Sequence, residues 1–362
     1  MKMLKRVFKD IYYTYRKLLY IICGRKQTSL FHKGTVCEVN LLDLEDNTRG
    51  DVVHPCVRYI PEGFRGHRWW MVYTPYYMHN NKLENPRLCY GVGMGQNETL
   101  APLQWVMVEE VESGKDVGYN SDPTIIYYNR SLYIYWRENN TERTTSAGNI
   151  RATYCKVYKE DTVKGVTEPI LIEKTKDSDK EMCPTFFANK DIFYCYGVDY
   201  LFNIGKWRNK QILNKIVWIT GKLGIYSQAK SNGIALWKGD SLEKPFKYIE
   251  TTQILNVNRL YKPWHMDFFS FEEKMYAVIL TNENLGDICL AERVDGDCFR
   301  MFKHPLLTNK SVGCIELYKP TALVVQGVFY LYYTARNLDD PSLNKLYLVS
   351  CPFVELINKL GN

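Results

Sequence analysis

The sequence predicts an all-β protein, a five-bladed β-propeller with a short N-terminal amphipathic helix. Five short signatures recur at spacings of about 53 to 81 residues, and each opens a run rich in aromatic and β-branched residues. A repeat of this length that contains only strand patterns is typical of propeller blades. The signatures are His54-Pro55, Asp122-Pro123, Cys183-Pro184, Trp264-His265-Met266-Asp267 and Tyr318-Lys319-Pro320.

A second observation supports the repeat: each opening run is followed by another that contains an aromatic cluster. In a propeller the first strands of all blades converge on one axis, so the opening residues of the units are expected to line one central pocket. The polar residues among them become candidates for one site: His54, Asp122, His265, Asp267 and Lys319.

The strands of each unit follow from alternating patterns divided by turn signals such as Tyr128-Asn129-Arg130 and Gln326-Gly327. Thr35–Leu42 is expected to close the ring by pairing with the last C-terminal strand, because an open ring would expose two edges. The first two units are expected at Trp69–Thr74, Arg87–Val92 and Gln104–Val108, and then at Asp122–Tyr128, Ser131–Arg137, Ile150–Tyr158 and Pro169–Glu173.

The remaining units continue the pattern to the C-terminal region. The third is predicted to be the longest, with an insertion near Leu201–Lys210. Its strands are expected at Cys183–Ala188, Asp191–Val198, Ile212–Ile219 and Ile234–Lys238. The fourth is expected at His265–Phe271, Lys274–Leu280, Asp287–Arg293 and Cys298–Phe302, and the fifth at Ile315–Val325, Val328–Ala335 and Lys345–Ser350.

Composition agrees with a large globular domain. The chain has 362 residues with 46% apolar and 24% charged residues, and its 28 Tyr suit half-buried strands and sugar-stacking surfaces alike. Eleven Cys without a Cys-x-x-Cys pair indicate buried free thiols and a reducing, cytoplasmic compartment. No metal and no cofactor is predicted, since the acidic pairs Asp177-Ser178-Asp179 and Asp295-Gly296-Asp297 lie in polar turns.

The charge is concentrated at the N-terminus. Residues 1–26 hold eight Lys and Arg and one acid, Asp10, which gives this segment a charge of +7, equal to the net charge of the whole chain. The rest is neutral, so nucleic acid is not an expected partner. We expect one propeller domain over residues 27–362.

Residues 1–26 also have the pattern of an amphipathic helix. Apolar residues recur at spacings of three and four, at Leu4, Phe8, Ile11, Tyr15, Leu18 and Ile22. One interpretation is an in-plane anchor on an anionic membrane, at the inner face of the plasma membrane. The other is a helix that packs its apolar face on the propeller.

Two motifs, Ser121-Asp122-Pro123 and Glu181-Met182-Cys183-Pro184, resemble motifs of the five-bladed propeller glycosidases, and this resemblance implies that carboxylates carry the chemistry. Cleavage of a glycosidic bond needs one carboxyl group to protonate the leaving oxygen and another to activate water or attack the anomeric carbon. A crowded axial pocket raises the pKa of one carboxyl group, so that it can act as the acid. The catalytic candidates are Glu84, Asp122, Glu181 and Asp267.

Other side chains near the signatures suit saccharide binding. Arg137 would pair with a carboxylate or an acidic sugar through its planar fork. His54, His265 and Lys319 would form hydrogen bonds to hydroxyl groups, and Trp264 and Tyr318 would stack on a sugar ring.

Two motifs resemble those of the five-bladed propeller glycosidases, the group of glycoside hydrolase families 43, 32, 62 and 68, with the phosphorylases of family 130 as relatives. Ser121-Asp122-Pro123 looks like their Asp-Pro element, and Glu181-Met182-Cys183-Pro184 looks like their Glu element with one extra residue. Over residues 50–352 the resemblance lies in the spacing of the repeated units. In the first unit this chain has His54-Pro55 where those enzymes have an acid, and Asp51 or Glu84 could supply that carboxylate.

The resemblance implies an enzyme that acts on glycosidic bonds, with an oligo- or polysaccharide as its partner. Hydrolysis is the first expectation. A membrane-associated glycosyltransferase or phosphorylase of polysaccharide biosynthesis is an alternative on the same fold. A carbohydrate-binding propeller without catalysis is another, because the first unit has exchanged its acid for His54.

Overall fold

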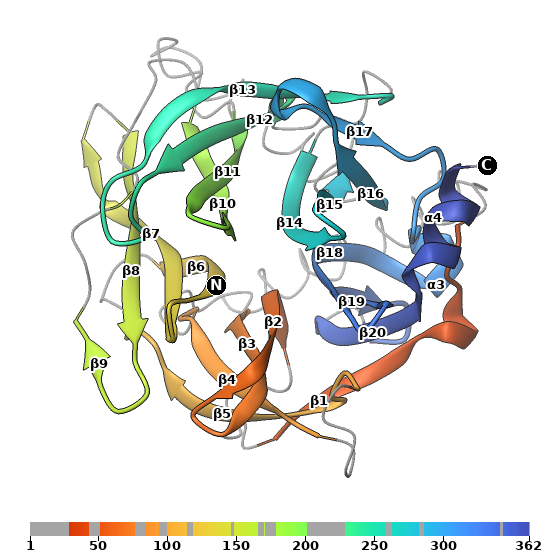
Figure 1. The fold of residues 1–362 in the computed structure, drawn as a ribbon, viewed down its shortest axis with the longest axis horizontal. Helices are drawn as coiled ribbons and strands as arrows, with labels where there is room; N and C mark the ends of the chain where they lie inside the picture. Colours follow the sequence, from red (N-terminus) through yellow and green to blue (C-terminus); the bar gives the residue numbers. More distant parts are fainter. Residues whose placement is uncertain are drawn as a thin grey trace, which may run out of the picture.

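The structure is a computed structural model that describes residues 29–42, 51–76, 84–93, 100–113, 119–145, 148–165, 170, 179–200, 229–257, 263–281, 286–340 and 343–361. The predicted N-terminal helix, residues 1–26, and the predicted insertion near 201–210 lie outside these residues. Strands dominate the described part, and consecutive groups of antiparallel strands surround a common centre (Figure 1). The all-β prediction is therefore confirmed.

Each signature lies in the first strand of a group, and these first strands lie nearest the centre (Figure 1). The first group contains β2 (Val52–Phe64), β3 (His67–Pro75), β4 (Arg87–Val92) and β5 (Gln104–Glu110). The second contains β6 (Tyr119–Tyr128), β7 (Ser131–Thr145), β8 (Gly148–Tyr158) and β9 (Val163–Lys164).

The next groups repeat this order. The third contains β10 (Asp179–Asn189), β11 (Ile192–Tyr200), β12 (Ala229–Gly239) and β13 (Lys247–Leu255). The fourth contains β14 (Pro263–Phe271), β15 (Lys274–Thr281), β16 (Ile288–Arg293) and β17 (Phe299–Met301). The last contains β18 (Cys314–Val325), β19 (Val328–Asn337), β20 (Lys345–Pro352) and the N-terminal strand β1 (Cys37–Leu42).

The predicted closure of the ring by the N-terminal strand is confirmed. Strand β1 pairs antiparallel with β20, with Cys37 opposite Leu348. It then runs parallel to β5, with Asn40 opposite Gln104. One short strand therefore joins the last group to the first and pairs with part of each exposed edge.

The strand predictions fail in two places among the described residues. The fourth strand of the second group is Val163–Lys164, whereas Ile170, inside the predicted strand, lies in a bend. In the third group, Ile234–Lys238 belongs to the third strand, β12, which pairs with β11, and the fourth strand is β13. The predicted strand Ile212–Ile219 lies outside the described residues.

The hydrophobic core lies between neighbouring groups of strands. One cluster joins the first and last groups, where the Trp105 and Tyr332 rings meet edge to face at 5.9 Å. Another joins the second and third groups, where Tyr135 stacks on Phe186 at 3.8 Å. Aromatic pairs of this kind prefer offset or edge-to-face contact. They hold adjacent groups of strands together.

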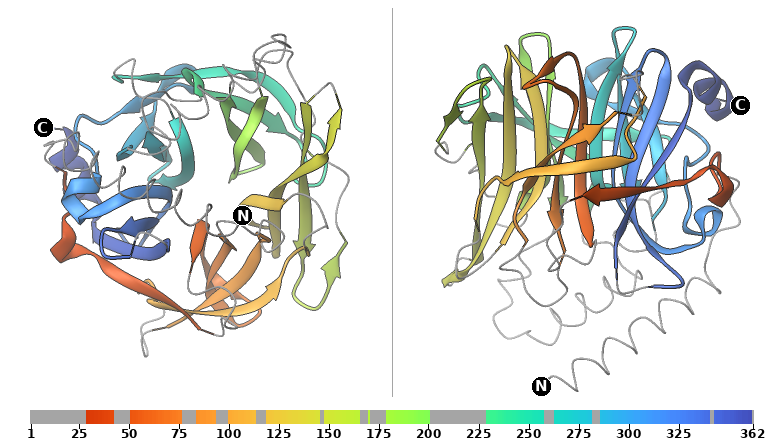
Figure 2. Two further views of the ribbon diagram at one scale, coloured as in Figure 1. Left: turned by 180° about the vertical axis from the view of Figure 1, so that it is seen from behind. Right: turned by 90° about the horizontal axis from the view of Figure 1, so that it is seen from below.

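The described helices are short and peripheral. They are η1 (Lys33–Thr35), η3 (Asp295–Asp297), α3 (Asn309–Val312) and α4 (Phe353–Gly361). No helix was predicted at α4, which lies at the outer edge beside β20 (Figure 2). Its Phe353 packs against Phe269, Tyr276 and Phe329. Within the described residues, none of the helices combines the length and the hydropathy needed to cross a membrane.

Candidate functional site at the propeller axis

The signatures coincide with β-bulges. Pairing of the first strand with its neighbour shifts register at the signature in all five groups, for example between Val53 and Cys56 and between Ser121 and Thr124. At three of them the residue before proline has a left-handed backbone, with φ of 55° at His54, 54° at Asp122 and 51° at Cys183. Such residues are uncommon outside glycine and cluster at functional sites, where a bulge redirects a side chain.

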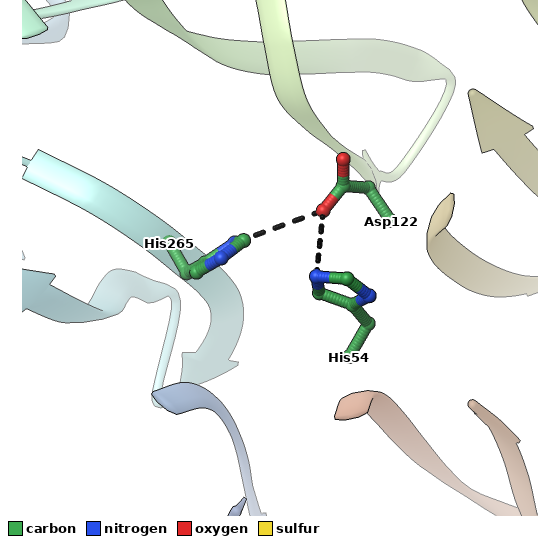
Figure 3. Close-up of side chains that lie close together, drawn as sticks. All are labelled: His54, Asp122 and His265. Atoms are coloured by element: carbon green, nitrogen blue, oxygen red, sulfur yellow. Dashed lines mark ion pairs between the residues drawn. The ribbon is translucent and has the colours of Figure 1, made fainter. Parts of the chain in front are cut away.

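Three of the predicted site residues meet at the axis. His54 on β2, Asp122 on β6 and His265 on β14 point toward one another (Figure 3). His54 Nε2 lies 3.2 Å from Asp122 Oδ1, and His265 Nδ1 lies 3.8 Å from the same oxygen. All three residues are at least 95% buried. The axis therefore holds a compact group of ionisable side chains from three different strands.

Arg137 holds the other oxygen of this carboxylate. Its Nε donates to Asp122 Oδ2 at 2.9 Å, and its Nη2 lies 2.7 Å from the same atom. Nη2 also donates to Ser121 Oγ at 3.0 Å. Burial alone would raise the pKa of Asp122, but Arg137 and the neighbouring His54, His265 and Lys319 outweigh it and hold this pKa well below its usual range. Asp122 is therefore ionised.

Both histidines are neutral. Burial lowers the pKa of His54 to about 4, because the nearby Asp122 only partly offsets desolvation and the charges of Lys319 and Arg137. Burial lowers the pKa of His265 well below its usual range, and His54 acts in the same direction. His54 Nδ1 also lies 2.8 Å from Thr74 Oγ1, which fixes the orientation of the ring.

Glu84 lies next to this group and, unlike Asp122, is uncharged. It is 95% buried, and burial and the charges of Asp122 and Asp51 raise its pKa well above the usual range, against an opposing effect of Arg137. Its backbone oxygen accepts a 3.0 Å hydrogen bond from the Asn120 amide, which fixes it beside β6. Glu84 is therefore a protonated carboxylic acid near an ionised one.

Further predicted binding residues surround the same point. Lys319 is buried and donates from Nζ to the Pro123 carbonyl at 3.1 Å. The Tyr318 ring lies 4.7 Å from that of His265 and 5.3 Å from that of His54. The Trp264 ring lies 5.9 Å from the His265 ring. The structure thus brings together His54, Asp122, Arg137, Trp264, His265, Tyr318 and Lys319 at the axis, with Glu84 within electrostatic range.

Asp267 belongs to a different group of contacts. Arg58 donates to both of its oxygens, at 2.8 Å and 2.7 Å, and Thr321 donates a short hydrogen bond to Oδ2. Thr321 in turn accepts from the Val57 amide at 3.1 Å. These contacts join the first, fourth and last groups, and they do not include His265, which precedes Asp267 by two residues.

Glu181 lies in β10, and the structure describes its backbone but not its side chain. Asp51, the alternative carboxylate of the first unit, accepts from the Asn344 amide at 3.0 Å and from its side chain at 2.9 Å. Arg58, Thr74 and Thr321 were missed by sequence reasoning. Their partners lie 209, 20 and 54 residues away in the chain, and no local motif marks them.

Comparison with known proteins agrees with this architecture. Neither a family model nor a curated protein matches the sequence. Among solved structures, an N-acetylgalactosamine deacetylase from F. plautii in complex with blood group B trisaccharide is 15% identical, with a TM-score of 0.64, over 92% of this chain and 97% of that one. A family 43 enzyme from Xanthomonas citri is 12% identical, with a TM-score of 0.56, over 84% and 89% of the two chains.

The fold is that of the family 43 propeller enzymes. A xylan β-1,4-xylosidase from Bacillus halodurans also matches, at 11% identity and a TM-score of 0.58. It covers 90% of this chain, which spans 54% of that enzyme. The resemblance to propeller glycosidases inferred from the two motifs is therefore confirmed, and at these identities it establishes the fold.

Proposed function

We propose that this chain is a carbohydrate-active hydrolase that binds a saccharide at the axis, beside the point where His54, Asp122 and His265 meet. The observation that carries the proposal is the convergence of these buried groups from three strands, each placed by a backbone bulge. Several structural neighbours are saccharide-processing enzymes, which supports the same substrate class. On this view the whole of residues 27–362 forms one five-bladed propeller.

The first candidate reaction is hydrolysis of a glycosidic bond. Glu84, held protonated, supplies the general acid, and Asp122, held ionised, supplies the base or nucleophile. Two carboxyl groups whose environments separate their pKa values are the usual arrangement in such enzymes. Glu181 remains a candidate for the second carboxylate. Asp267 is proposed to stabilise the fold, since Arg58 and Thr321 occupy its oxygens.

The second candidate reaction is hydrolysis of an acyl substituent on a saccharide. Two observations favour it. His54 occupies the bulge position where propeller glycosidases are expected to have an acid, and the deacetylase from F. plautii matches over nearly the full length of both chains. In this reaction Glu84 is again the proton donor. Tyr318 and Trp264 would provide stacking surfaces for the sugar, and Lys319 a donor.

Incubation with aryl glycosides, oligosaccharides and N- or O-acetylated sugars tests the proposal, with separate detection of reducing ends and of acetate. We expect turnover of one class by the wild type. We expect Asp122→Asn to lower it at least about 100-fold, the usual effect of losing a positioned acid–base group. Asp161→Asn, at an exposed carboxylate, is the matched control. Saccharide binding without turnover of any class would favour the non-catalytic propeller instead.

A further inference from the structure

Buried polar atoms at the axis face one another without hydrogen bonds. Among the described residues, Asp122 Oδ1 and both ring nitrogens of His265 lack a hydrogen-bond partner. His54 Nε2 lies only 3.2 Å from this Oδ1, yet the oxygen lies off the line of an N–H bond. A buried polar atom without a partner costs about 1–3 kcal/mol, so the orphaned Asp122 Oδ1 and His265 Nδ1, only 3.8 Å apart, require a physical explanation.

The hydrogen bond between His54 and Thr74 determines which ring nitrogen of His54 carries the proton. The Thr74 hydroxyl can donate to the Val53 carbonyl at 3.5 Å, and it then accepts from His54 Nδ1 at 2.8 Å. In that arrangement the proton of the neutral ring is on Nδ1, and Nε2 presents a lone pair to the ionised Asp122. Two lone pairs at 3.2 Å repel each other unless a cation lies between them.

We propose that His54 Nε2, Asp122 Oδ1 and His265 Nδ1 bind one divalent transition-metal ion. Ligand atoms about 2.0–2.1 Å from a tetrahedral metal are separated by about 3.3 Å. The distances to Asp122 Oδ1 are 3.2 Å and 3.8 Å, and the three atoms lie within 4.8 Å of one another. Imidazole nitrogen favours zinc, cobalt and iron over magnesium and calcium, which prefer oxygen.

The neighbouring contacts suit a site of this kind. Arg137 occupies Asp122 Oδ2 and directs Oδ1 toward the histidines, and Thr74 fixes the ring of His54. Such outer contacts orient ligands, and their loss typically weakens metal binding 10- to 100-fold. Three protein ligands leave a coordination position for water or substrate. The cations of Arg137 and Lys319 oppose a second positive charge, so affinity below that of a closed four-ligand site is expected.

Direct metal binding tests the proposal without any saccharide. Protein treated with a chelator and then freed of it is titrated with Zn²⁺ and Co²⁺ by calorimetry, and Co²⁺ is also followed by its visible absorption. We expect one ion per chain, with Ca²⁺ and Mg²⁺ failing to compete. His265→Ala should lower the Zn²⁺ affinity at least 100-fold. Because the buried ring packs against Trp264 and Tyr318, this variant also loses some stability, so circular dichroism is used to confirm that it is folded under the conditions of the titration.

Two further variants keep the test decisive. Thr74→Val should weaken Zn²⁺ binding 10- to 100-fold. His304→Gln, in the half-buried segment between β17 and α3, should not change it. Failure to bind Zn²⁺ or Co²⁺ at one ion per chain, or equal binding by wild type and His265→Ala, overturns the proposal. Because binding is measured directly, a failed hydrolase assay does not affect this result.

Metal binding would also discriminate between the two candidate reactions. Asp122 cannot serve as a free base or nucleophile while Oδ1 binds a metal and Arg137 occupies Oδ2. Confirmed binding therefore favours acyl hydrolysis over cleavage of a glycosidic bond by Asp122.

Discussion

Arg137 binds only one oxygen of Asp122: its Nε and Nη2 both approach Oδ2, at 2.9 Å and 2.7 Å, and Oδ1 is left for the histidines. The two side chains come from paired strands, with Ser121 directly opposite Arg137. A buried carboxylate is thereby kept charged while half of it stays available for chemistry. Both the proposed hydrolysis and the proposed metal binding depend on this unequal sharing.

Removal of Arg137 should destabilise the protein. Arg137→Ala leaves the Asp122 carboxylate buried with its main positive partner missing, and the loss of one member of a buried pair costs about 3–5 kcal/mol. Chemical denaturation of the wild type and the variant measures the change. Arg300→Ala, at an exposed position of β17, should change the free energy of unfolding by less than about 0.5 kcal/mol. Equal losses in both variants would argue against a special role of Arg137.

Glu84→Gln should lower the activity without lowering the stability. Because the raised pKa keeps Glu84 protonated at neutral pH, the neutral amide has nearly the same shape and charge as the native group. We expect an unchanged melting temperature and a loss of hydrolysis by about 10²- to 10⁴-fold, the range for general acid catalysis. Glu355→Gln, exposed on α4, is the matched control. Retained activity in Glu84→Gln would assign the proton donor to another residue.

Asp267→Asn should lower the stability and leave the activity nearly unchanged. The substitution leaves Arg58 without its bidentate carboxylate, so we expect a loss of about 3–5 kcal/mol in the free energy of unfolding. Activity per folded molecule should stay within a few-fold of the wild type. The double variant Arg58→Met with Asp267→Leu should recover most of the lost stability, since a buried ion pair can often be replaced by apolar residues. A large drop in the turnover of folded Asp267→Asn protein would instead restore its predicted catalytic role.

The buried histidines predict a pH dependence of stability in chelator. The pKa of His54 falls from 6.5 when unfolded to about 4 when folded, so the unfolded state binds more protons between these values. The free energy of unfolding should therefore fall as the pH is lowered from 6.5 to 4, by up to about 1.4 kcal/mol per pH unit for this group. His265 acts in the same direction. Glu84, whose pKa is raised, acts in the opposite direction above its unfolded pKa.

Comparison of the wild type with His54→Asn isolates the contribution of His54 to the pH dependence of stability. Denaturation of wild type and His54→Asn at several pH values between 4 and 6.5 gives two slopes, and their difference reports His54 alone. We expect the variant to have the shallower dependence in this window. Identical slopes would mean that His54 is not buried in its neutral form.

The basic N-terminal segment gives a prediction that rests on sequence. We propose that residues 1–26 bind the surface of an anionic membrane, since their charge of +7 is combined with an apolar stripe at helical spacing. Flotation with vesicles that contain phosphatidylserine should recover the full chain and not a chain that begins at residue 27. Neutral vesicles should recover much less of either. Equal flotation of the two chains would support the alternative, a helix packed on the propeller.

Local sequence predicted the inner strands well because three constraints coincide in them: burial, a bulge and proline. The outer strand β13 was missed because it reads as polar, with most of its residues outside the core. Strand β12 was expected too late because Ser231, Asn232 and Gly233 resemble a loop. Gly233 has a packing reason, since a Cβ there would lie 2.3 Å from the Thr252 backbone oxygen.

The site was predictable to the extent that its residues lie at the bulges. His54, Asp122 and His265 share this position, and the propeller repeat implied that they converge. What could not be predicted is which neighbour each side chain meets across the axis. Asp267 is two residues beyond His265, a rise of about 6.6 Å along the strand. That step separates a contact with Asp122 from a contact with Arg58, whose position 209 residues away is visible only in the folded chain.

The left-handed residue before the proline of three signatures has an evolutionary consequence. His54, Asp122 and Cys183 adopt the same unusual backbone conformation, with φ between 51° and 55°, although their side chains have unrelated chemistry. The same conformation under three unrelated side chains indicates that the β-bulge, and not the side chain, sets the backbone at these positions. A single substitution there can therefore exchange an acid for a base or a thiol while the ring stays intact, which makes a propeller of this type able to acquire new reactions one residue at a time.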